Sequence, residues 1–253
     1  MIPDDESRTI DTVVLGFVGD PMTRWVWPEA HQYLAAMPRF VRAFGGAAFA
    51  QGGAFCSDEY AGAALWLRPG VHPDEERLVE LMESTAAPDA REAGGAIFEQ
   101  MAKYHPEEVH WYLPLIGVDP AHQRRGHGDA LMRYALEQID REKVPAYLES
   151  SNPRNLSLYR RHGFEELGTI QFAPHPRSFR CCDVRDSRAK SECPVVLEGA
   201  QRAHRRRRVR DESSDYVCFS GQEVGHSFLN PRRIQIHLTI VSELVSRTAR
   251  MAK

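Results

Sequence analysis

The stretch WYLPLIGVDPAHQRRGHG, residues 111–128, carries more information about this protein than any other part of the sequence. Its first eight residues have the apolar character of a buried strand, and a helical pattern begins at Gly128. The turn before that helix contains Gly126 and Gly128, which let the backbone come close to a ligand. The first amides of a helix lack partners within it and carry partial positive charge. The stretch therefore predicts a pyrophosphate site, to which Arg124 and Arg125 add charge.

Other phosphate-binding loops fit this turn poorly. Position 131 is Leu131, so the Gly-x-Gly-x-x-Gly pattern of dinucleotide-binding domains is missing. The Gly-x-x-x-x-Gly-Lys-Ser/Thr pattern of P-loop enzymes is missing as well. A double-glycine turn alone is also compatible with an ordinary strand-to-helix connection, and the residues that follow decide between these interpretations.

A regular order of elements follows the turn. The apolar residues Leu131, Ala135 and Ile139 recur at helical spacing and predict a helix from Gly128 to about Arg141. The elements expected after it are a strand over 144–149, a short helix over 153–161 capped by Ser151 or Asn152, a left-handed helix end at Gly163, and an extended stretch from Phe164.

Two polar residues of the short helix are candidates for chemistry. Asn155 and Tyr159 lie four residues apart, so they share one face and would point into the groove between the two strands. A phenol with an ordinary pKa of about 10 is protonated at neutral pH and can donate a proton to a leaving group. The alternatives are structural, with Asn155 as a local cap and Tyr159 as a core residue.

Together these segments resemble the core of the GCN5-related N-acetyltransferase (GNAT) superfamily. Residues 116–128 resemble its acetyl-CoA motif, Gln/Arg-x-x-Gly-x-Gly/Ala. Residues 147–155, followed by Tyr159 and Gly163-Phe164, resemble its second motif. The amino-acid sequence of this second motif is similar to that of the branch that contains puromycin N-acetyltransferase.

The resemblance implies an α/β (α+β) fold with a mixed, mostly antiparallel central sheet flanked by helices. It also implies transfer of an acetyl group from acetyl-CoA to the primary amine of a small molecule. The amine would attack the thioester directly in a ternary complex, without a covalent acyl-enzyme. The alternative is a catalytically inactive protein that binds a CoA thioester.

The same resemblance assigns roles to individual residues. Tyr159 would protonate the departing thiolate, and Asn155 would contact the cofactor. Glu149, on the strand beside the groove, is the candidate general base, and its alternative role is that of a structural hydrogen-bond acceptor. The backbone that would pair with the pantetheine arm is that of Ile116, Gly117 and Val118. The turn that would hold the pyrophosphate consists of Gln123, Arg124, Arg125, Gly126, His127, Gly128 and Asp129.

The first part of the chain would complete this domain and build the acceptor side of the site. Residues 7–18 predict a helix, with too few residues before it for a full first strand. A missing first strand leaves a sheet edge open and would favour a homodimer. The other elements expected here are a helical region from Pro28 kinked or divided at Pro38, strands over 47–51 and 61–67, and helices over 72–83 and 96–104.

Three tryptophans are candidates for an aromatic wall around the acceptor. Trp25, Trp27 and Trp66 would favour a flat aromatic or aminonucleoside-like amine if all three lined the pocket. The alternative for each is a place in the hydrophobic core.

The character of the chain changes after about residue 173. We interpret residues 1–173 as the acetyltransferase domain, with core motifs at 111–167, and residues 174–253 as an atypical, largely disordered tail. A last strand of the domain has only a weak candidate, residues 178–184. The arginine-rich run at 202–210 could bind nucleic acid, but no aromatic residues are interleaved with it, which argues against that role. The pattern over 233–249 favours a helix over a strand.

Composition sets the remaining limits. The chain has 253 residues, a net charge of −3 and 42% hydrophobic residues, as expected of a globular protein. We expect no transmembrane segment, no secretory signal and a cytoplasmic location, since the start of the chain is acidic. The five cysteines do not form Cys-x-x-Cys pairs, so we expect free thiols and no metal.

Overall fold

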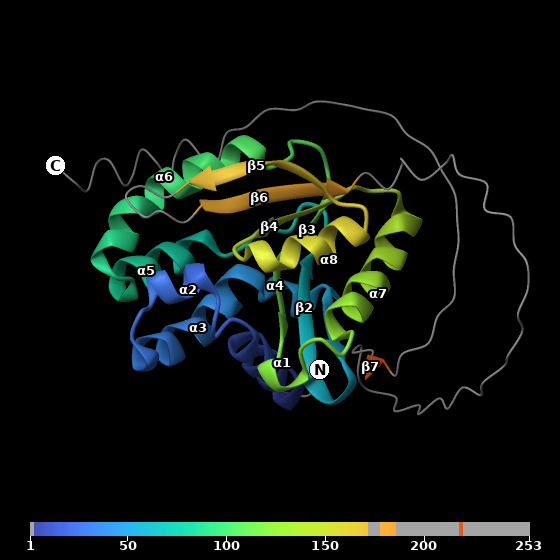
Figure 1. The fold of residues 1–253 in the computed structure, drawn as a ribbon, viewed down its shortest axis with the longest axis horizontal. Helices are drawn as coiled ribbons and strands as arrows, with labels where there is room; N and C mark the ends of the chain where they lie inside the picture. Colours follow the sequence, from blue (N-terminus) through green and yellow to red (C-terminus); the bar gives the residue numbers. More distant parts are fainter. Residues whose placement is uncertain (1–2, 172–177, 186–217, 220–253) are drawn as a thin grey trace, which may run out of the picture.

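The computed structural model describes residues 3–171, 178–185 and 218–219 (Figure 1). None of the helices in these ranges combines the length and the hydropathy needed to cross a membrane. Four of the described helices precede the first strand: α1 (Pro3–Gly16), α2 (Pro21–Val26), α3 (Ala30–Gly45) and α4 (Ala47–Ala50). Two more, α5 (Glu75–Thr85) and α6 (Pro88–Tyr104), lie between the second and third strands. The later helices are α7 (His127–Glu142) and α8 (Leu156–Arg161).

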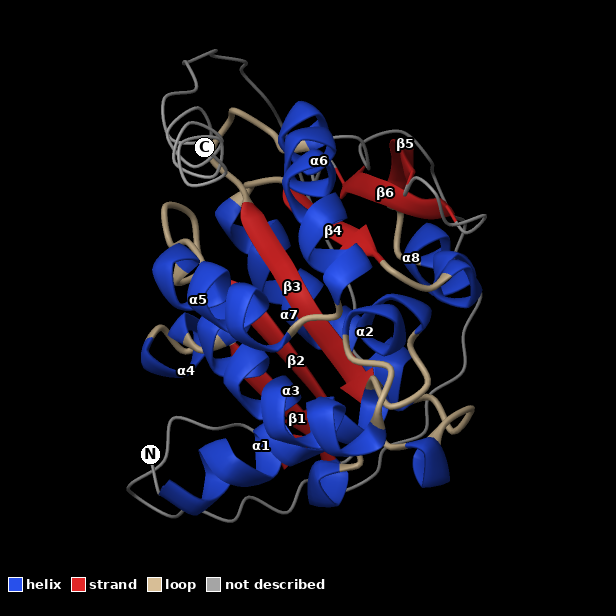
Figure 2. Ribbon diagram, turned by 90° about the vertical axis from the view of Figure 1, so that its left-hand side faces the viewer, coloured by secondary structure: helices blue, strands red, loops and turns tan. Residues whose placement is uncertain are grey.

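One mixed sheet of seven strands forms the centre of the described part, in the order β5-β6-β4-β3-β2-β1-β7. Figure 2 shows β4, β6 and β5 on one side of β3, with β2 and β1 on the other. The strands are β1 (Ala54–Ser57), β2 (Gly62–Leu67), β3 (Trp111–Val118), β4 (Ala146–Ser150), β5 (Glu165–Gln171), β6 (Ser178–Arg185) and β7 (Cys218–Phe219). The pairs β3–β4 and β1–β7 are parallel and the others antiparallel, which confirms the expected fold class.

The two faces of the sheet bury two separate cores because side chains alternate along each strand. Residues such as Leu65 and Leu115 face helices α1 to α6, where they pack with Val13 and Met37. Their sequence neighbours, including Trp66, face helices α7 and α8. Both cores lie within one layered unit, which holds the two sets of helices at fixed positions on the sheet.

Strands β3 and β4 separate part-way along their length. The parallel pairing covers only Trp111 to Leu113 of β3, opposite Ala146 to Leu148 of β4. From Pro114 onward β3 pairs with β2 alone. Proline has no amide hydrogen and cannot donate to a neighbouring strand, so its position is compatible with the end of pairing there. The result is a V-shaped opening between the two strands.

Helix α1 lies unusually close to the end of β3. A Cβ atom on Gly16 would lie 2.6 Å from the Cα of Gly117, which no real side chain permits. The two glycines therefore allow the backbones of helix and strand to touch. This contact fixes the N-terminal helix against the strand that borders the opening.

Most elements expected from the sequence are present. The strand over 111–118, the helix after the double-glycine turn, the strand before Ser150 and the short helix ending at Arg161 are confirmed. Gly163 has a φ of 81°, as expected for a left-handed helix end. The weak candidate at 178–184 is strand β6, which lies between β4 and β5, so the sheet continues past residue 173.

The strand expected over residues 47–51 is wrong in position. Residues 47–51 do not form a strand, because the sequence Ala-Ala-Phe-Ala has high helix propensity and forms α4. The strand lies at Ala54–Ser57 instead, where all four residues are buried. A strand buried on both faces lacks the alternating pattern that would identify it in the sequence.

Helix α3 also differs from expectation, because it continues through Pro38 and is not divided there. Tyr33, Met37 and Val41 lie on one buried face, and this packing holds both halves together. The carbonyl of Leu34, which loses its usual partner, belongs to a residue that is 60% exposed, so water can solvate it. Helix α2 was not expected at all.

No strand precedes α1 in the part of the chain that the structure describes. Strand β1 lies between β2 and the edge strand β7, with which it pairs in parallel through two residues, Cys56 with Cys218 and Ser57 with Phe219. The rest of the chain after residue 185, including the arginine-rich run and the segment 233–249, lies outside the described residues.

Candidate active site

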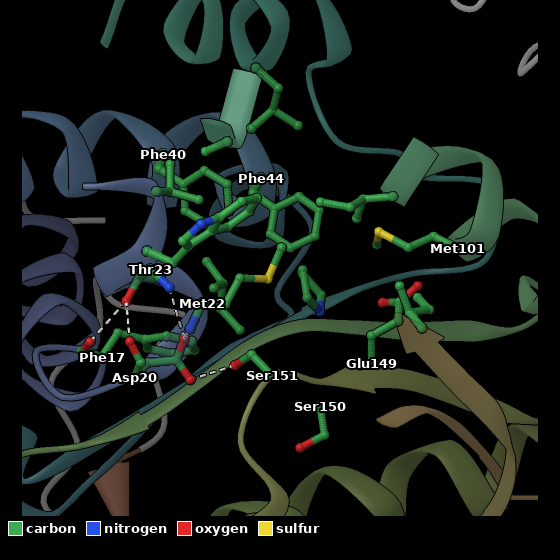
Figure 3. Close-up of a pocket in the computed structure, with 18 of the residues that line it drawn as sticks. Phe17, Asp20, Met22, Thr23, Phe40, Phe44, Met101, Glu149, Ser150 and Ser151 are labelled. Carbon is green, nitrogen blue, oxygen red and sulfur yellow. Dashed lines mark hydrogen bonds between the residues drawn. The ribbon is translucent and has the colours of Figure 1, made fainter. Parts of the chain in front are cut away.

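A cavity of about 150 Å³ lies where the V-shaped opening meets the N-terminal helices (Figure 3). One wall comes from β4 and α8 and includes Glu149, Asn155 and Tyr159. The opposite wall comes from α2, α3, α5 and α6 and is almost entirely apolar. We call these the polar wall and the apolar wall. Ile116 of β3 lies between them.

Glu149 is the most unusual residue of the polar wall. Its Oε2 accepts a hydrogen bond of 2.7 Å from the hydroxyl of Tyr112. Its Oε1 is buried and accepts no hydrogen bond from the residues that the structure describes. The nearest cationic candidate is His105, whose Nδ1 lies 4.0 Å from Oε1. A buried carboxylate oxygen without a donor is costly, so this atom is suited to a proton or an ammonium group from a ligand.

A cluster of aromatic side chains packs next to Glu149. The ring of His105 contacts those of His110 and Tyr147, each with centroids 4.8 Å apart. Burial, followed by the charge of Glu149, raises the pKa of Tyr112 well above its ordinary value. The same causes raise the pKa of Tyr147. Both phenols therefore remain protonated, and Tyr112 remains a hydrogen-bond donor to the carboxylate.

Tyr159 reaches the cavity from the short helix α8, and Asn155 reaches it from the helical turn 153–155 just before α8. Leu156 and Tyr159 form the buried face of α8, and Tyr159 is 3% exposed. Its ring packs edge-on against Phe164. Asn155 lines the cavity but does not cap α8, and Asn152 instead caps the turn before it by accepting from the amide of Arg154.

The double-glycine turn has the backbone geometry that the sequence implied. Gly126 precedes α7 with a φ of 91°, and Arg124 has a φ of 62°. Helix α7 begins at His127, so the amides of His127, Gly128 and Asp129 belong to its first turn. Gln123 donates from its side chain to the carbonyl of Val118, at 3.2 Å, and thereby fastens the turn to β3.

A hydrogen bond between side chains connects this turn to the helix that carries Tyr159. His162 Nε2, at the end of α8, lies 3.0 Å from Oδ1 of Asp129. Burial would raise the pKa of Asp129, but the hydrogen bond from Arg133 and the interaction with His162 outweigh it, so the pKa is lowered. The turn and the proton-donor candidate are therefore held at a fixed distance from each other.

The sequence-predicted residues fall into two groups in space. Glu149, Tyr159, Asn155 and Ile116 line one cavity. Gly117, Val118 and residues 123–129 are outside that lining, along the open edge of β3 and at the start of α7. An extended ligand lying in the opening would pass from the second group to the first.

The three tryptophans have different positions. Trp25 and Trp27 line the cavity, as the aromatic-wall hypothesis required. Trp66 does not, because it is fully buried in the core that faces α7 and α8. Strand alternation decides this, since Trp66 and its neighbours Leu65 and Leu67 point to opposite faces.

A contact that was not expected from the sequence joins the two walls. Asp20 accepts at Oδ1 from the amides of Met22 and Thr23, both at 3.0 Å, and caps α2. Its Oδ2 accepts from the hydroxyl of Ser151 at 2.6 Å, just beyond β4 (Figure 3). Burial outweighs these hydrogen bonds and raises the pKa of Asp20. An Asp before a Pro-initiated helix could have suggested the cap, but nothing local could have indicated Ser151.

Metal ligands do not gather in the described ranges, where no cluster of three or more His, Cys, Asp or Glu residues could hold an ion. Cys56 is buried, and its Sγ lies 3.1 Å from the hydroxyl of Thr9.

Residues 86–166, from α6 to the start of β5, match a family model described as "Acetyltransferase (GNAT) domain". This region of the chain is therefore similar to a GNAT acetyltransferase domain. It contains the opening, the double-glycine turn and the polar wall, whereas most of the apolar wall precedes it.

The chain also resembles solved structures of acetyltransferases. A structure described as histone acetyltransferase HPA2 and related acetyltransferase from Corynebacterium glutamicum is 24% identical, with a TM-score of 0.52. The match covers 78% of this chain and 96% of that one. An N-acetyltransferase from Staphylococcus aureus is 17% identical, covers 72% of this chain and 96% of its own, and has a TM-score of 0.44. The first of these supports the same fold, and the second is too distant for further argument.

Proposed function

We propose that this protein transfers the acetyl group of acetyl-CoA to the primary amine of a small molecule. The observation that carries the proposal is the cavity at the V-shaped opening, where a buried phenol shares one wall with a buried carboxylate oxygen that accepts no hydrogen bond from the described residues. A thioester carbonyl bound between Glu149 and Tyr159 would have a base on the side of the amine and an acid on the side of the sulfur.

The cofactor would lie along the opening. The pyrophosphate would bind at residues 123–129, where the first amides of α7 and two arginines favour an anion. The pantetheine arm would pair with the backbone of residues 116–118, whose edge facing β4 has no strand partner in the described sheet. Asn155 would contact the end of the arm near the thioester.

The chemical step is a direct displacement. Glu149 takes a proton from the substrate ammonium, and the free amine nitrogen forms a bond to the thioester carbonyl carbon. The carbon–sulfur bond then breaks, and Tyr159 gives its proton to the departing thiolate. The new amide nitrogen loses its extra proton, which returns Tyr159 to its phenol form. Holding amine and thioester together supplies most of the rate, and the two proton transfers each add about a hundred to ten thousandfold.

Turnover with a Tyr159→Phe variant tests the proposal. The purified chain is incubated with acetyl-CoA and an amine panel, and free thiol is measured as CoA is released. We expect Tyr159→Phe to lower kcat at least tenfold, with little change in the Kd of acetyl-CoA measured by calorimetry. Tyr134→Phe is the matched control, because Tyr134 lies on α7 and does not line the cavity. Saturable acetyl-CoA binding without release of CoA by any amine would instead identify an inactive binding protein.

We also propose that the chain belongs to the puromycin N-acetyltransferase-like branch. The amino-acid sequence of residues 147–155 supports this assignment. Acetylation of puromycin on its primary amine is the direct test, with the product identified by mass spectrometry. If the protein acetylates other amines but not puromycin, the branch assignment is wrong and the proposed acetyltransferase activity still holds.

A further inference from the structure

The chemistry of the apolar wall limits what the acceptor can be. Apart from the hydroxyl of Thr23, which donates to backbone carbonyls, its side chains are aromatic, thioether or aliphatic. No Lys, Arg or His is among the described residues that line the cavity. The largest side chains of the apolar wall are Met22, Trp25, Trp27, Phe40, Phe44, Phe98 and Met101. Figure 3 shows Phe40 and Phe44 together on this wall, while Glu149 and Met101 lie at one end of the cavity and Asp20 at the other. Such a wall binds apolar groups and leaves charged ones without compensation.

Only one of the two carboxylates in the cavity needs a cation. Asp20 already accepts from two backbone amides and the hydroxyl of Ser151. Glu149 has a buried oxygen, Oε1, without a hydrogen-bond donor from the described residues. One ammonium group would satisfy Oε1, whereas a second would have to leave water for an apolar surface and would lose its hydration without gaining a partner.

The size of the cavity points to a compact group. Its volume is about 150 Å³, and a cavity of about that volume in another protein binds benzene. One aromatic ring or a short alkyl chain fills such a space, and aromatic and Met side chains favour contact with it.

We propose that the acceptor is a compact monoamine: its one ammonium group binds Glu149, and an aromatic or alkyl body packs on the apolar wall. This inference rests on the proposed acetyltransferase function and specifies its substrate class. It does not rest on the proposed puromycin-like branch, because puromycin is larger than the group that this cavity would hold. It excludes diamines and polyamines, whose second charge has no partner there, and highly hydroxylated amines, whose hydroxyls would lose water without new hydrogen bonds.

A matched pair of amines tests the charge argument. Hexylamine and 1,6-diaminohexane have the same chain length and differ in the second ammonium group alone. With saturating acetyl-CoA, we expect kcat/KM to be at least a hundredfold higher for hexylamine, and phenethylamine to be used at least as well. Equal or better use of the diamine would overturn the inference and leave the acetyltransferase function intact.

Binding measurements distinguish a failure of this inference from a failure of the proposed acetyltransferase function. The affinities of hexylamine and 1,6-diaminohexane are compared by calorimetry in the presence of CoA. Selective binding of hexylamine without turnover of any amine would contradict the proposed function alone. No preference for hexylamine would overturn the inference, whatever the activity.

A variant of the apolar wall checks that the cavity itself makes the selection. Trp25 is partly buried and lines the cavity, so Trp25→Ala should raise the KM for phenethylamine about tenfold. Leu34→Ala is the control, because Leu34 is 60% exposed and lies outside the cavity lining. Trp25→Phe, which keeps an aromatic ring, should retain most of the affinity. An unchanged KM in Trp25→Ala would place the acceptor elsewhere and overturn the inference.

Discussion

The two walls of the cavity differ in origin and in chemistry. The polar wall comes from consecutive elements, β4 and α8, and presents a carboxylate, an amide and a phenol. The apolar wall is assembled from α2, α3, α5 and α6, which are spread over residues 21–104, and presents aromatic and thioether groups. Under our proposal, the polar wall carries the reaction and the apolar wall selects the substrate. Changes to one wall should therefore leave the property of the other largely unchanged.

The largest expected effect is on the polar wall. Glu149→Gln keeps the shape of the side chain but cannot accept a proton from an ammonium group. We expect kcat to fall about a hundred to ten thousandfold. The Kd of acetyl-CoA should change little, because Glu149 lies away from the double-glycine turn. Turnover within about threefold of the parent would show that the division between the walls is wrong and that Glu149 only accepts hydrogen bonds.

The cluster behind the polar wall should make stability depend on pH. Burial lowers the pKa of His110 from 6.5 to about 4, and the nearby His105 adds to this effect. The unfolded chain therefore takes up a proton at this residue before the folded one does. The contribution of His110 to the free energy of unfolding is therefore complete above a pH of about 6.5. It falls by up to about 3 kcal/mol as the pH is lowered toward about 4.

His110→Asn removes that titration. Urea unfolding at neutral pH and at a pH of about 4.5, inside this window, should show a smaller loss of free energy of unfolding for the variant than for the parent. His31→Asn is the control, because His31 is exposed on α3. Parallel pH profiles of parent and His110→Asn would contradict a neutral, buried His110.

The contact between the walls gives a smaller effect. Ser151→Ala removes the donor to Oδ2 of Asp20, which ties the end of β4 to α2. A hydrogen bond to a charged group contributes about 1.5–3 kcal/mol, so we expect stability to fall by about 2 kcal/mol. The acceptor KM should rise as α2 loosens. Ser157→Ala, on the exposed face of α8, should be neutral by both measurements.

The smallest effect in this series concerns the double-glycine turn. Gly126 has a φ of 91°, and a Cβ atom added to it would have no other atom within 4 Å, so Gly126→Val acts through backbone strain. A left-handed residue costs about 1–2 kcal/mol, which should weaken acetyl-CoA binding about tenfold. Gly19→Val is the matched control, since Gly19 is equally open but has no positive φ. If calorimetry gives the parent and Gly126→Val the same affinity for acetyl-CoA, the turn is not part of the cofactor site.

The elements around the double-glycine turn could be predicted from short patterns because each of their features is local. A strand, a turn with Gly126 and a helix with an apolar stripe are contiguous, and Asn155 and Tyr159 share a face by helix periodicity alone. The expectations that failed lie in the first half. The strand expected over residues 47–51 was misplaced because an all-buried strand and a short alanine-rich helix have no distinguishing period.

Local sequence was enough for the elements from Trp111 to Gln171 and for the residues proposed to handle protons. Only the tertiary structure placed Trp25 in the cavity and Trp66 in a core, because the face that a strand residue occupies depends on how the sheet is covered. It also brought Ser151 to Asp20 and left one oxygen of Glu149 without a donor from the described residues. Such contacts join residues far apart in the chain, and no periodicity along the sequence encodes them.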